Sequence, residues 1–117
     1  MAWKLDTKKP IYLQIMDEVK ARIVSGTYSP GDKLPSVREL AVEAGVNPNT
    51  MQKAMSELER TGLVISNRTQ GRFVTEDEKV LKSIRKDNLE TVLNDFFKTM
   101  ENLGYTREDV KKIVKDY

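Results

Sequence analysis

The run from Lys33 to Leu63 constrains this chain more than any other part of its sequence. It contains two short helical patterns that are joined by only Gly45 and Val46. Ser36 and Glu39 have the S-x-x-E spacing of a capping box, which satisfies free backbone N–H groups where a helix begins. Because so short a connection forces two helices to cross at a steep angle, this run predicts a helix-turn-helix.

The second helix of the pair begins with residues that suit a helix start and also form hydrogen bonds. Asn47 is a good N-cap residue, and Pro48 suits the first helical position, where its missing N–H costs nothing. Further polar side chains follow in the first turns, at Asn49, Thr50, Gln52 and Lys53. Asn and Gln can bond bidentately to adenine, Thr can contact a base or a phosphate, and Lys can contact a phosphate. We therefore expect this helix to contact DNA, although Asn47 is explained equally well as a cap alone.

Arg38 is expected on the outward side of the first helix of the pair. A surface ion pair with Glu39 or Glu43 would be its ordinary explanation elsewhere. Beside a second helix that enters a DNA groove, the position favours contact with DNA.

Two strand-like segments follow directly, at residues 63–66 and 72–75, and residues 67–71 between them form a Gly-containing hairpin loop. Lys33-Leu34-Pro35 could add one short extended segment. A hairpin straight after the second helix predicts the winged variant of the fold. The wing residues expected to contact DNA are Arg68, Gln70, Gly71 and Arg72, although a charged hairpin tip is usually only a solvated loop. Gly71 would allow close approach of the backbone, or would satisfy a positive φ in the turn.

Helical patterns flank this region on both sides. A first helix is expected from about Pro10 to Ser25, a long one from about Asp77 to Leu103, and a short final one from Thr106 that includes Tyr117. The expected fold is therefore mainly α with a small β-hairpin. It is a winged helix-turn-helix followed by a C-terminal two-helix segment.

The long helix carries more apolar surface than the short final helix can cover. Its expected interface residues are Leu89, Val92, Leu93, Phe96, Phe97 and Met100. At roughly 25 cal/mol per Å² of apolar area, leaving this surface in water would cost several kcal/mol. Packing against the first helix, with Trp3 or Tyr12 covering part of the surface, is the alternative. We expect a two-fold homodimer, with residues 1–75 as the DNA-binding domain and residues 76–117 as the helical dimerisation segment.

The residue types that the chain lacks narrow its chemistry. The 117 residues include no Cys and no His, which removes disulfides, thiolate and histidine metal ligands, and Ser-His or Cys-His dyads. With no evident acid pair or Gly-rich phosphate loop, we expect no enzyme, no metal site and no cofactor. No apolar run approaches the roughly 20 residues of a membrane span, and the N-terminus lacks the apolar core of a signal peptide. We expect a cytoplasmic protein without a membrane partner.

Five segments carry a continuous set of motifs. They are P-I-Y-L-Q-I at 10–15, I-V-S-G-T-Y-S-P-G-D-K-L-P-S-V-R-E-L-A at 23–41, V-N-P-N-T-M-Q-K-A at 46–54, L-E-R-T-G-L at 58–63 and G-R-F-V at 71–74. From about Pro10 to Val74 the chain thereby resembles the DNA-binding domain of the GntR family of bacterial transcription regulators. The short tail and the N-P-N-T segment resemble the YtrA-like subfamily, in which two helices replace a large effector domain and mediate dimerisation.

The resemblance implies a sequence-specific transcription regulator, favouring a repressor that binds a palindromic operator in double-stranded DNA as a homodimer. By position it implies DNA contacts at Arg38, Asn47, Asn49, Thr50, Gln52, Gln70 and Gly71. Better-known members have arginines in the first turns of the second helix, where this chain has Pro48 and Gln52. The resemblance therefore does not imply that arginines of this helix recognise guanine.

Two questions about partners stay open at this point. Residues 1–75 carry a net charge of +3 and residues 76–117 a net charge of −1, a modest lean that also suits a winged-helix protein-interaction module without sequence-specific DNA binding. An unknown small-molecule effector is the other open partner. The C-terminal segment alone is too short to enclose a typical small-molecule pocket.

Overall fold

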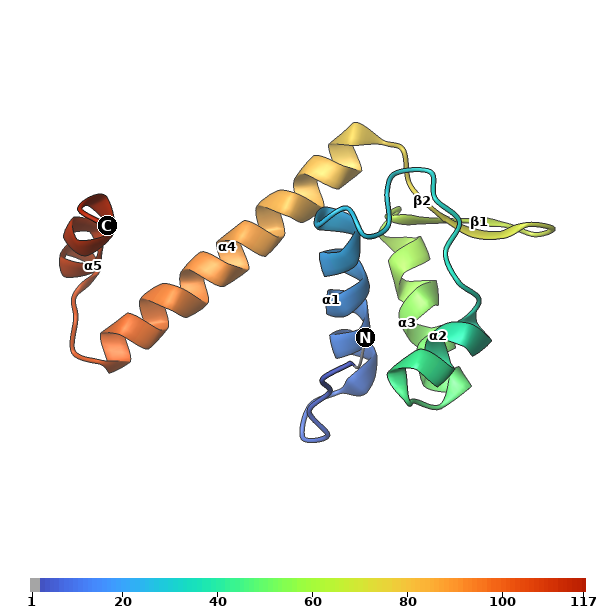
Figure 1. Ribbon diagram of the computed structural model, residues 1–117, viewed down its shortest axis with the longest axis horizontal. Coiled ribbons are helices and arrows are strands. Elements are labelled where there is room, and N and C mark those ends of the chain that lie inside the picture. Colours follow the sequence, from blue (N-terminus) through green and yellow to red (C-terminus); the bar gives the residue numbers. More distant parts are fainter. Residues whose placement is uncertain (1–2) are drawn as a thin grey trace. The chain divides into compact units, whose positions relative to one another are not determined.

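The computed structural model describes residues 3–117. In chain order its elements are α1 (Ile11–Val24), α2 (Val37–Ala44), α3 (Pro48–Arg60), β1 (Val64–Asn67), β2 (Gly71–Val74), α4 (Glu78–Asn102) and α5 (Arg107–Lys115) (Figure 1). The expected mainly helical fold with a two-stranded wing is confirmed. The chain divides into two compact units between Ile84 and Arg85, so that α4 begins in the first unit and ends in the second.

The hydrophobic core of the first unit lies among α1, α2, α3 and the hairpin. Its most deeply buried side chains come from all of these elements and include Ile15, Val19, Leu40, Met51, Met55, Leu58, Leu63, Val64 and Val74. Trp3 and Tyr12 pack against this core, as do Val80, Leu81 and Ile84 from the first turns of α4. Trp3 and Tyr12 therefore have their packing partners within the winged-helix unit.

Local hydrogen bonds fix where α2 and α3 begin and end. The Ser36 hydroxyl accepts from the Glu39 N–H at 3.1 Å, and the Glu39 carboxylate accepts from the Ser36 N–H at 3.2 Å, so the expected capping box is present. Gly45 ends α2 with a φ of 71°, a left-handed conformation that a residue with a Cβ rarely adopts. Asn47 caps α3, its side-chain oxygen accepting from the Asn49 N–H at 2.7 Å. These caps set the angle of the helix-turn-helix.

The capping box makes α2 sensitive to acid. Hydrogen bonds from the backbone and the side chain of Ser36 hold the pKa of Glu39 below its usual value of 4.5. Because the folded state favours the carboxylate, this stabilisation is present above pH 4.5 and is lost as the pH falls through the lowered pKa. We expect Glu39→Gln to reduce the decline in the free energy of unfolding below that pH, measured by urea titration. An unchanged acid dependence in the variant would contradict this contribution.

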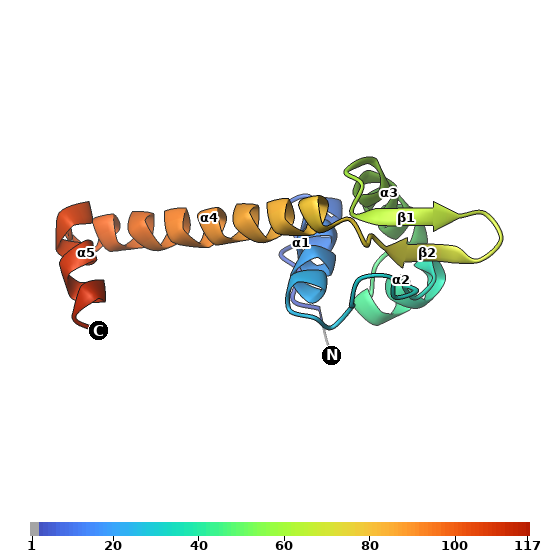
Figure 2. The same ribbon diagram turned by 90° about the horizontal axis from the view of Figure 1, so that it is seen from above.

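The wing is slightly different from the expected hairpin. β1 and β2 are antiparallel, with Val64 opposite Val74 and Asn67 opposite Gly71, so that the two strands lie side by side (Figure 2). The pairing of Asn67 with Gly71 shortens the loop to residues 68–70, where the sequence predicted 67–71. The expected extended segment is also present, because Lys33 forms a bridge with Phe73 and the Leu34 N–H donates to the Arg72 carbonyl at 2.8 Å.

The second unit consists of the remainder of α4 and α5. Thr106 and Asp109 form a second capping box at the start of α5, as the sequence predicted. The Phe96 and Phe97 rings meet edge to face at 5.7 Å, and the Arg107 guanidinium lies 4.4 Å from the centre of the Phe97 ring. The final helix ends at Lys115, so Tyr117 lies beyond it. Within residues 3–117, no helix has the length and apolar character needed to cross a membrane.

Candidate nucleic-acid interface

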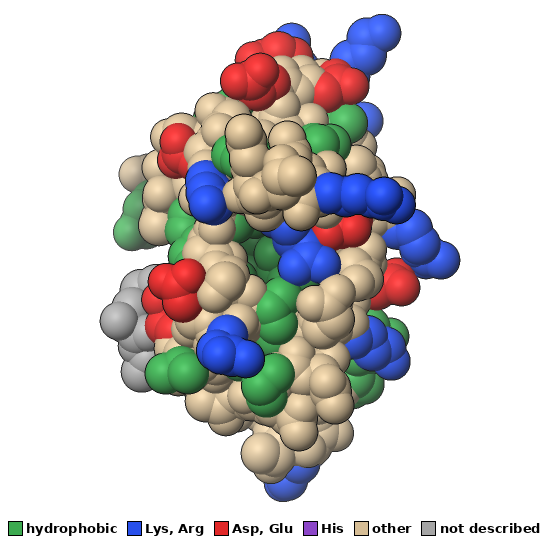
Figure 3. All heavy atoms as spheres, turned by 90° about the vertical axis from the view of Figure 1, so that its right-hand side faces the viewer, with side chains coloured by type: hydrophobic (Ala, Val, Ile, Leu, Met, Phe, Trp, Pro, Cys, Tyr) green, Lys and Arg blue, Asp and Glu red, His purple; other side chains and the backbone are tan. Residues whose placement is uncertain are grey.

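A groove on the first unit brings together residues from α2, α3 and the wing. It is lined by Lys33, Leu34, Pro35, Ser36, Val37, Arg38, Glu39, Gln52, Gln70, Gly71 and Arg72. Figure 3 shows the face that carries the wing, where Lys and Arg side chains flank a hollow. Five of the residues expected to contact DNA therefore line one groove, although they lie up to 34 positions apart in the sequence.

Arg38 is exposed at this groove, and both of its expected acidic neighbours have other partners. Glu39 is held in the capping box by Ser36. Glu43 accepts hydrogen bonds from Arg22 and Trp3. Among the residues that the structure describes, Arg38 forms no ion pair, which leaves its guanidinium available to an external acceptor.

The first turns of α3 present a row of polar side chains. Asn47 and Asn49 are exposed and Thr50 is half-buried. The exposed Gln52 side chain reaches the groove and donates to the Ser56 hydroxyl at 3.1 Å. The Asn47 side chain is used as the helix cap. Gln52 is therefore the α3 side chain that shares the groove with Arg38 and the wing.

Two basic side chains that were expected to contact DNA have partners inside the chain. The Lys53 ammonium lies 3.9 Å from the centre of the Tyr12 ring, so it points toward α1. Arg72 forms an ion pair with Glu59 of α3 and keeps only 19% of its side chain exposed. These pairs join residues that are 13 or more positions apart, and helical or strand spacing could not reveal them.

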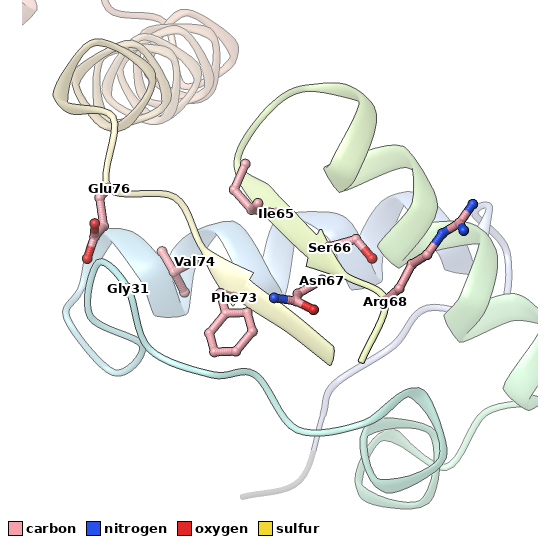
Figure 4. Close-up of a pocket in the computed structure, with 8 residues that line it drawn as sticks. All are labelled: Gly31, Ile65, Ser66, Asn67, Arg68, Phe73, Val74 and Glu76. Carbon is pink, nitrogen blue, oxygen red and sulfur yellow. The ribbon is translucent and has the colours of Figure 1, made fainter. Parts of the chain in front are cut away.

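The wing residues that were expected to contact DNA do not all face the same groove. Gln70 and Gly71 line the groove, whereas Arg68 borders a separate surface hollow together with Phe73 and Glu76 (Figure 4). Gly71 has a φ of 103°, and a Cβ at this position would lie 3.4 Å from the Lys33 Cε. The positive φ is therefore sufficient to explain a glycine here, whereas close approach of its backbone to DNA stays a prediction.

Lys33 also lines the groove, although no DNA contact was predicted for it from the sequence. It is exposed, it lines the groove, and its backbone pairs with Phe73 of the wing. The extended Lys33-Leu34-Pro35 segment was the signal that could have identified it, because an added strand would place Lys33 beside the hairpin. Arg72 is neutralised by Glu59, so the other charged groups that line the groove are the cations Lys33 and Arg38 and the carboxylate of Glu39. This balance suits a polyanion.

Comparison with known proteins supports the same interpretation. Residues 11–74 match the model of "Bacterial regulatory proteins, gntR family". The "Uncharacterized HTH-type transcriptional regulator YhcF" of Bacillus subtilis (strain 168) is 42% identical over 97% of this chain and 94% of its own length. The "HTH-type transcriptional repressor YtrA" of the same strain is 38% identical over 92% of this chain and 86% of its own length.

Solved structures extend the likeness to three dimensions. A "GntR family transcriptional regulator from Listeria monocytogenes" superposes with a TM-score of 0.84 at 40% identity, covering 97% of this chain and 99% of that one. A structure of "AraR(DBD) in complex with operator ORX1" has a TM-score of 0.58 at 29% identity, covering 64% of this chain and 95% of that one. The family match covers more than half of the chain and coincides with the unit that carries the groove. The chain therefore belongs to the GntR family of bacterial regulatory proteins.

Proposed function

We propose that this DNA-binding transcription regulator is a repressor that binds a palindromic operator as a homodimer. The observation that carries the proposal is the convergence of Arg38, Gln52, Gln70 and Gly71 on one groove from three separate elements. Family membership makes the chain a helix-turn-helix regulator rather than an enzyme. The repressor role is supported by YtrA, which is named a repressor. Such a protein acts where bacterial DNA lies, so we assign it to the cytoplasm.

We assign DNA recognition to residues 1–75. In this assignment α3 enters the major groove, with Gln52 suited to adenine and with Asn49 and Thr50 reaching bases or phosphates. Arg38, on α2, contacts a base or a phosphate. Gln70 and Gly71 bring the wing close to the DNA backbone. Lys33 and Arg68 supply exposed positive charge. Asn47, Lys53 and Arg72 already have partners within the chain, and their DNA contacts require those partners to be exchanged or shared.

We assign dimerisation to residues 76–117. No residue of α4 is buried, and Leu89, Val92 and Phe96 keep 57%, 64% and 39% of their surfaces exposed. An apolar hollow in the same unit is lined by Phe96, Met100, Ile113, Val114 and Tyr117. Exposed apolar area of this extent favours association with a second copy. A two-fold dimer would present two α3 helices to two half-sites, which explains why we propose a palindrome.

We expect Arg38→Ala and Gln52→Ala each to weaken operator binding by about 1 to 3 kcal/mol if the side chain reads a base. The duplex for this measurement is recovered from a random-sequence library by in vitro selection with the unaltered protein. Binding is measured by fluorescence anisotropy across a range of salt concentrations. If Arg38 contacts a phosphate instead, its replacement lowers affinity for all sequences and reduces the salt dependence.

Arg60→Ala is the matched control, since Arg60 lies at the far end of α3 with 80% of its side chain exposed. It should leave the affinity nearly unchanged. Unchanged affinity in both the Arg38 and the Gln52 variants would contradict the proposed reading face. Failure of the unaltered protein to enrich any sequence would instead favour a protein-interaction module.

A further inference from the structure

The short helix α2 carries Arg38 and packs on the core through a small face, formed by the buried Leu40 and Ala41 with the partly buried Val37 and Ala44. Only Leu40 and Ala41 of its eight residues are buried. Its N-terminus is stabilised locally by the capping box, which makes no connection to another helix. A polar contact from the exposed side of α2 to a neighbouring element adds a second point that fixes the orientation of the helix.

Glu43, in the last turn of α2, provides such a tie to α1. Its Oε2 atom accepts from the Arg22 Nη1 at 2.8 Å and also from the indole N–H of Trp3 at 2.5 Å. Burial alone would raise the pKa of Glu43, but hydrogen bonds from Trp3 and Arg22 lower it below its usual value. One carboxylate oxygen thus joins α2 to both α1 and the N-terminal arm, residues 3–9.

Arg22 forms the centre of this cluster. It keeps only 6% of its surface exposed, and its Nε donates to Glu18 at 3.0 Å while its Nη1 also donates to the Tyr28 hydroxyl. Its Nη2 is buried without a hydrogen-bond partner in the part of the chain that the structure describes. The central carbon of the guanidinium lies 4.6 Å from the centre of the Trp3 ring, so the face of the indole stabilises the cation.

The other end of the arm is also anchored. The Gln14 side chain accepts from the Asp6 N–H at 2.7 Å and donates to the Asp6 carbonyl at 2.7 Å. A second donation reaches the Lys9 carbonyl at 3.2 Å. Gln14 thus holds the arm against α1. Hydrogen bonds at residues 6 and 9 and the Trp3 contacts together fix the position of the arm.

We propose that Trp3 is a positioning residue for DNA recognition: by docking on Arg22 and Glu43, it holds α2 so that Arg38 reaches the groove. The N-terminal arm is then part of the DNA-reading unit. This inference rests on the proposed function, specifically on the contact of Arg38 with DNA. The proposal therefore predicts that Trp3 changes the affinity for DNA through its effect on the position of Arg38.

A double-mutant cycle tests this link on the full chain with the selected duplex. We expect Trp3→Ala to weaken binding about fivefold in the unaltered protein but less than about twofold in an Arg38→Ala background. Lys4→Ala, at an exposed arm residue, is the control and should have no effect in either background. Equal losses in both backgrounds, or no loss from Trp3→Ala alone, would overturn the inference. Arg38→Ala without effect would remove the DNA contact on which this inference rests, and the proposed function would fail as well if Gln52→Ala also had no effect.

A second pair of variants keeps Trp3 in place, so the test does not depend on the folding of Trp3→Ala. Glu43→Gln retains an oxygen that can accept from the indole, whereas Glu43→Ala removes it. Trp3 is the only tryptophan, and its fluorescence reports directly on docking. We expect red-shifted emission and about fivefold weaker binding for Glu43→Ala, with both properties largely preserved in Glu43→Gln. Undisplaced emission together with normal affinity in Glu43→Ala would refute the positioning role.

Discussion

Phe96→Asp is expected to convert the protein to a monomer and to weaken binding to a two-half-site operator by about a hundredfold or more. The Phe96 side chain is 39% exposed and lines the apolar hollow with Met100 and Ile113. A carboxylate on this surface would have to lose its water at an interface without a compensating cation. Without the dimer, each winged-helix unit would bind its half-site independently and lose the gain from simultaneous contact.

Sedimentation velocity at micromolar concentration and anisotropy with the selected duplex measure the two effects together. Asn94→Asp is the matched control, because it adds the same charge two residues away on the opposite side of α4. It should remain dimeric and bind normally. A Phe96→Asp protein that sediments as a dimer would place the interface elsewhere.

Leu58→Ala is expected to lower the free energy of unfolding by about 2 to 5 kcal/mol. Leu58 lies on α3 and is completely buried among residues of α1 and the hairpin. Truncation to alanine removes its transfer free energy and leaves a cavity that the surrounding helices fill only in part. Because α3 also carries residues that we propose to contact DNA, the variant should bind DNA more weakly under conditions in which a substantial fraction of it is unfolded.

Urea unfolding followed by circular dichroism measures this loss. Leu103→Ala is the control, since it deletes the same atoms from a side chain that is 67% exposed. We expect its free energy of unfolding to change by less than about 0.5 kcal/mol at a fixed protein concentration. A loss for Leu58→Ala no larger than for Leu103→Ala would contradict the assignment of Leu58 to the core.

Local signals allowed most of the fold to be predicted from the sequence. Ser36 with Glu39, Asn47 with Pro48, and Thr106 with Asp109 each begin a helix where the structure has one. Such caps depend on residues within three positions of each other, so sequence spacing is sufficient to recognise them. The strand boundaries were one residue in error because pairing across the hairpin depends on the register of both strands.

The candidate site was less completely predictable. The polar row on α3 and the arginine on α2 follow from helix spacing, but the partners of several side chains do not. The Lys53 contact with Tyr12, the Arg72 pair with Glu59 and the Trp3 contact with Glu43 join separate elements. Each depends on how the elements pack, and local sequence patterns carry no information on that packing. Lys33 is different, because the extended Lys33-Leu34-Pro35 segment was a local signal that could have placed it beside the wing.

The ion pair between Arg72 and Glu59 has a consequence for the design of chimeric regulators. It joins β2 of the wing to α3, so we expect these two elements to be exchanged together in a chimera. Residues 68–70, at the tip, lie outside this pair, so we expect that they can be exchanged between relatives by themselves. A donor hairpin that replaces Arg72 would leave the Glu59 carboxylate without its ion-pair partner, so we expect such a chimera to need a matching change at position 59.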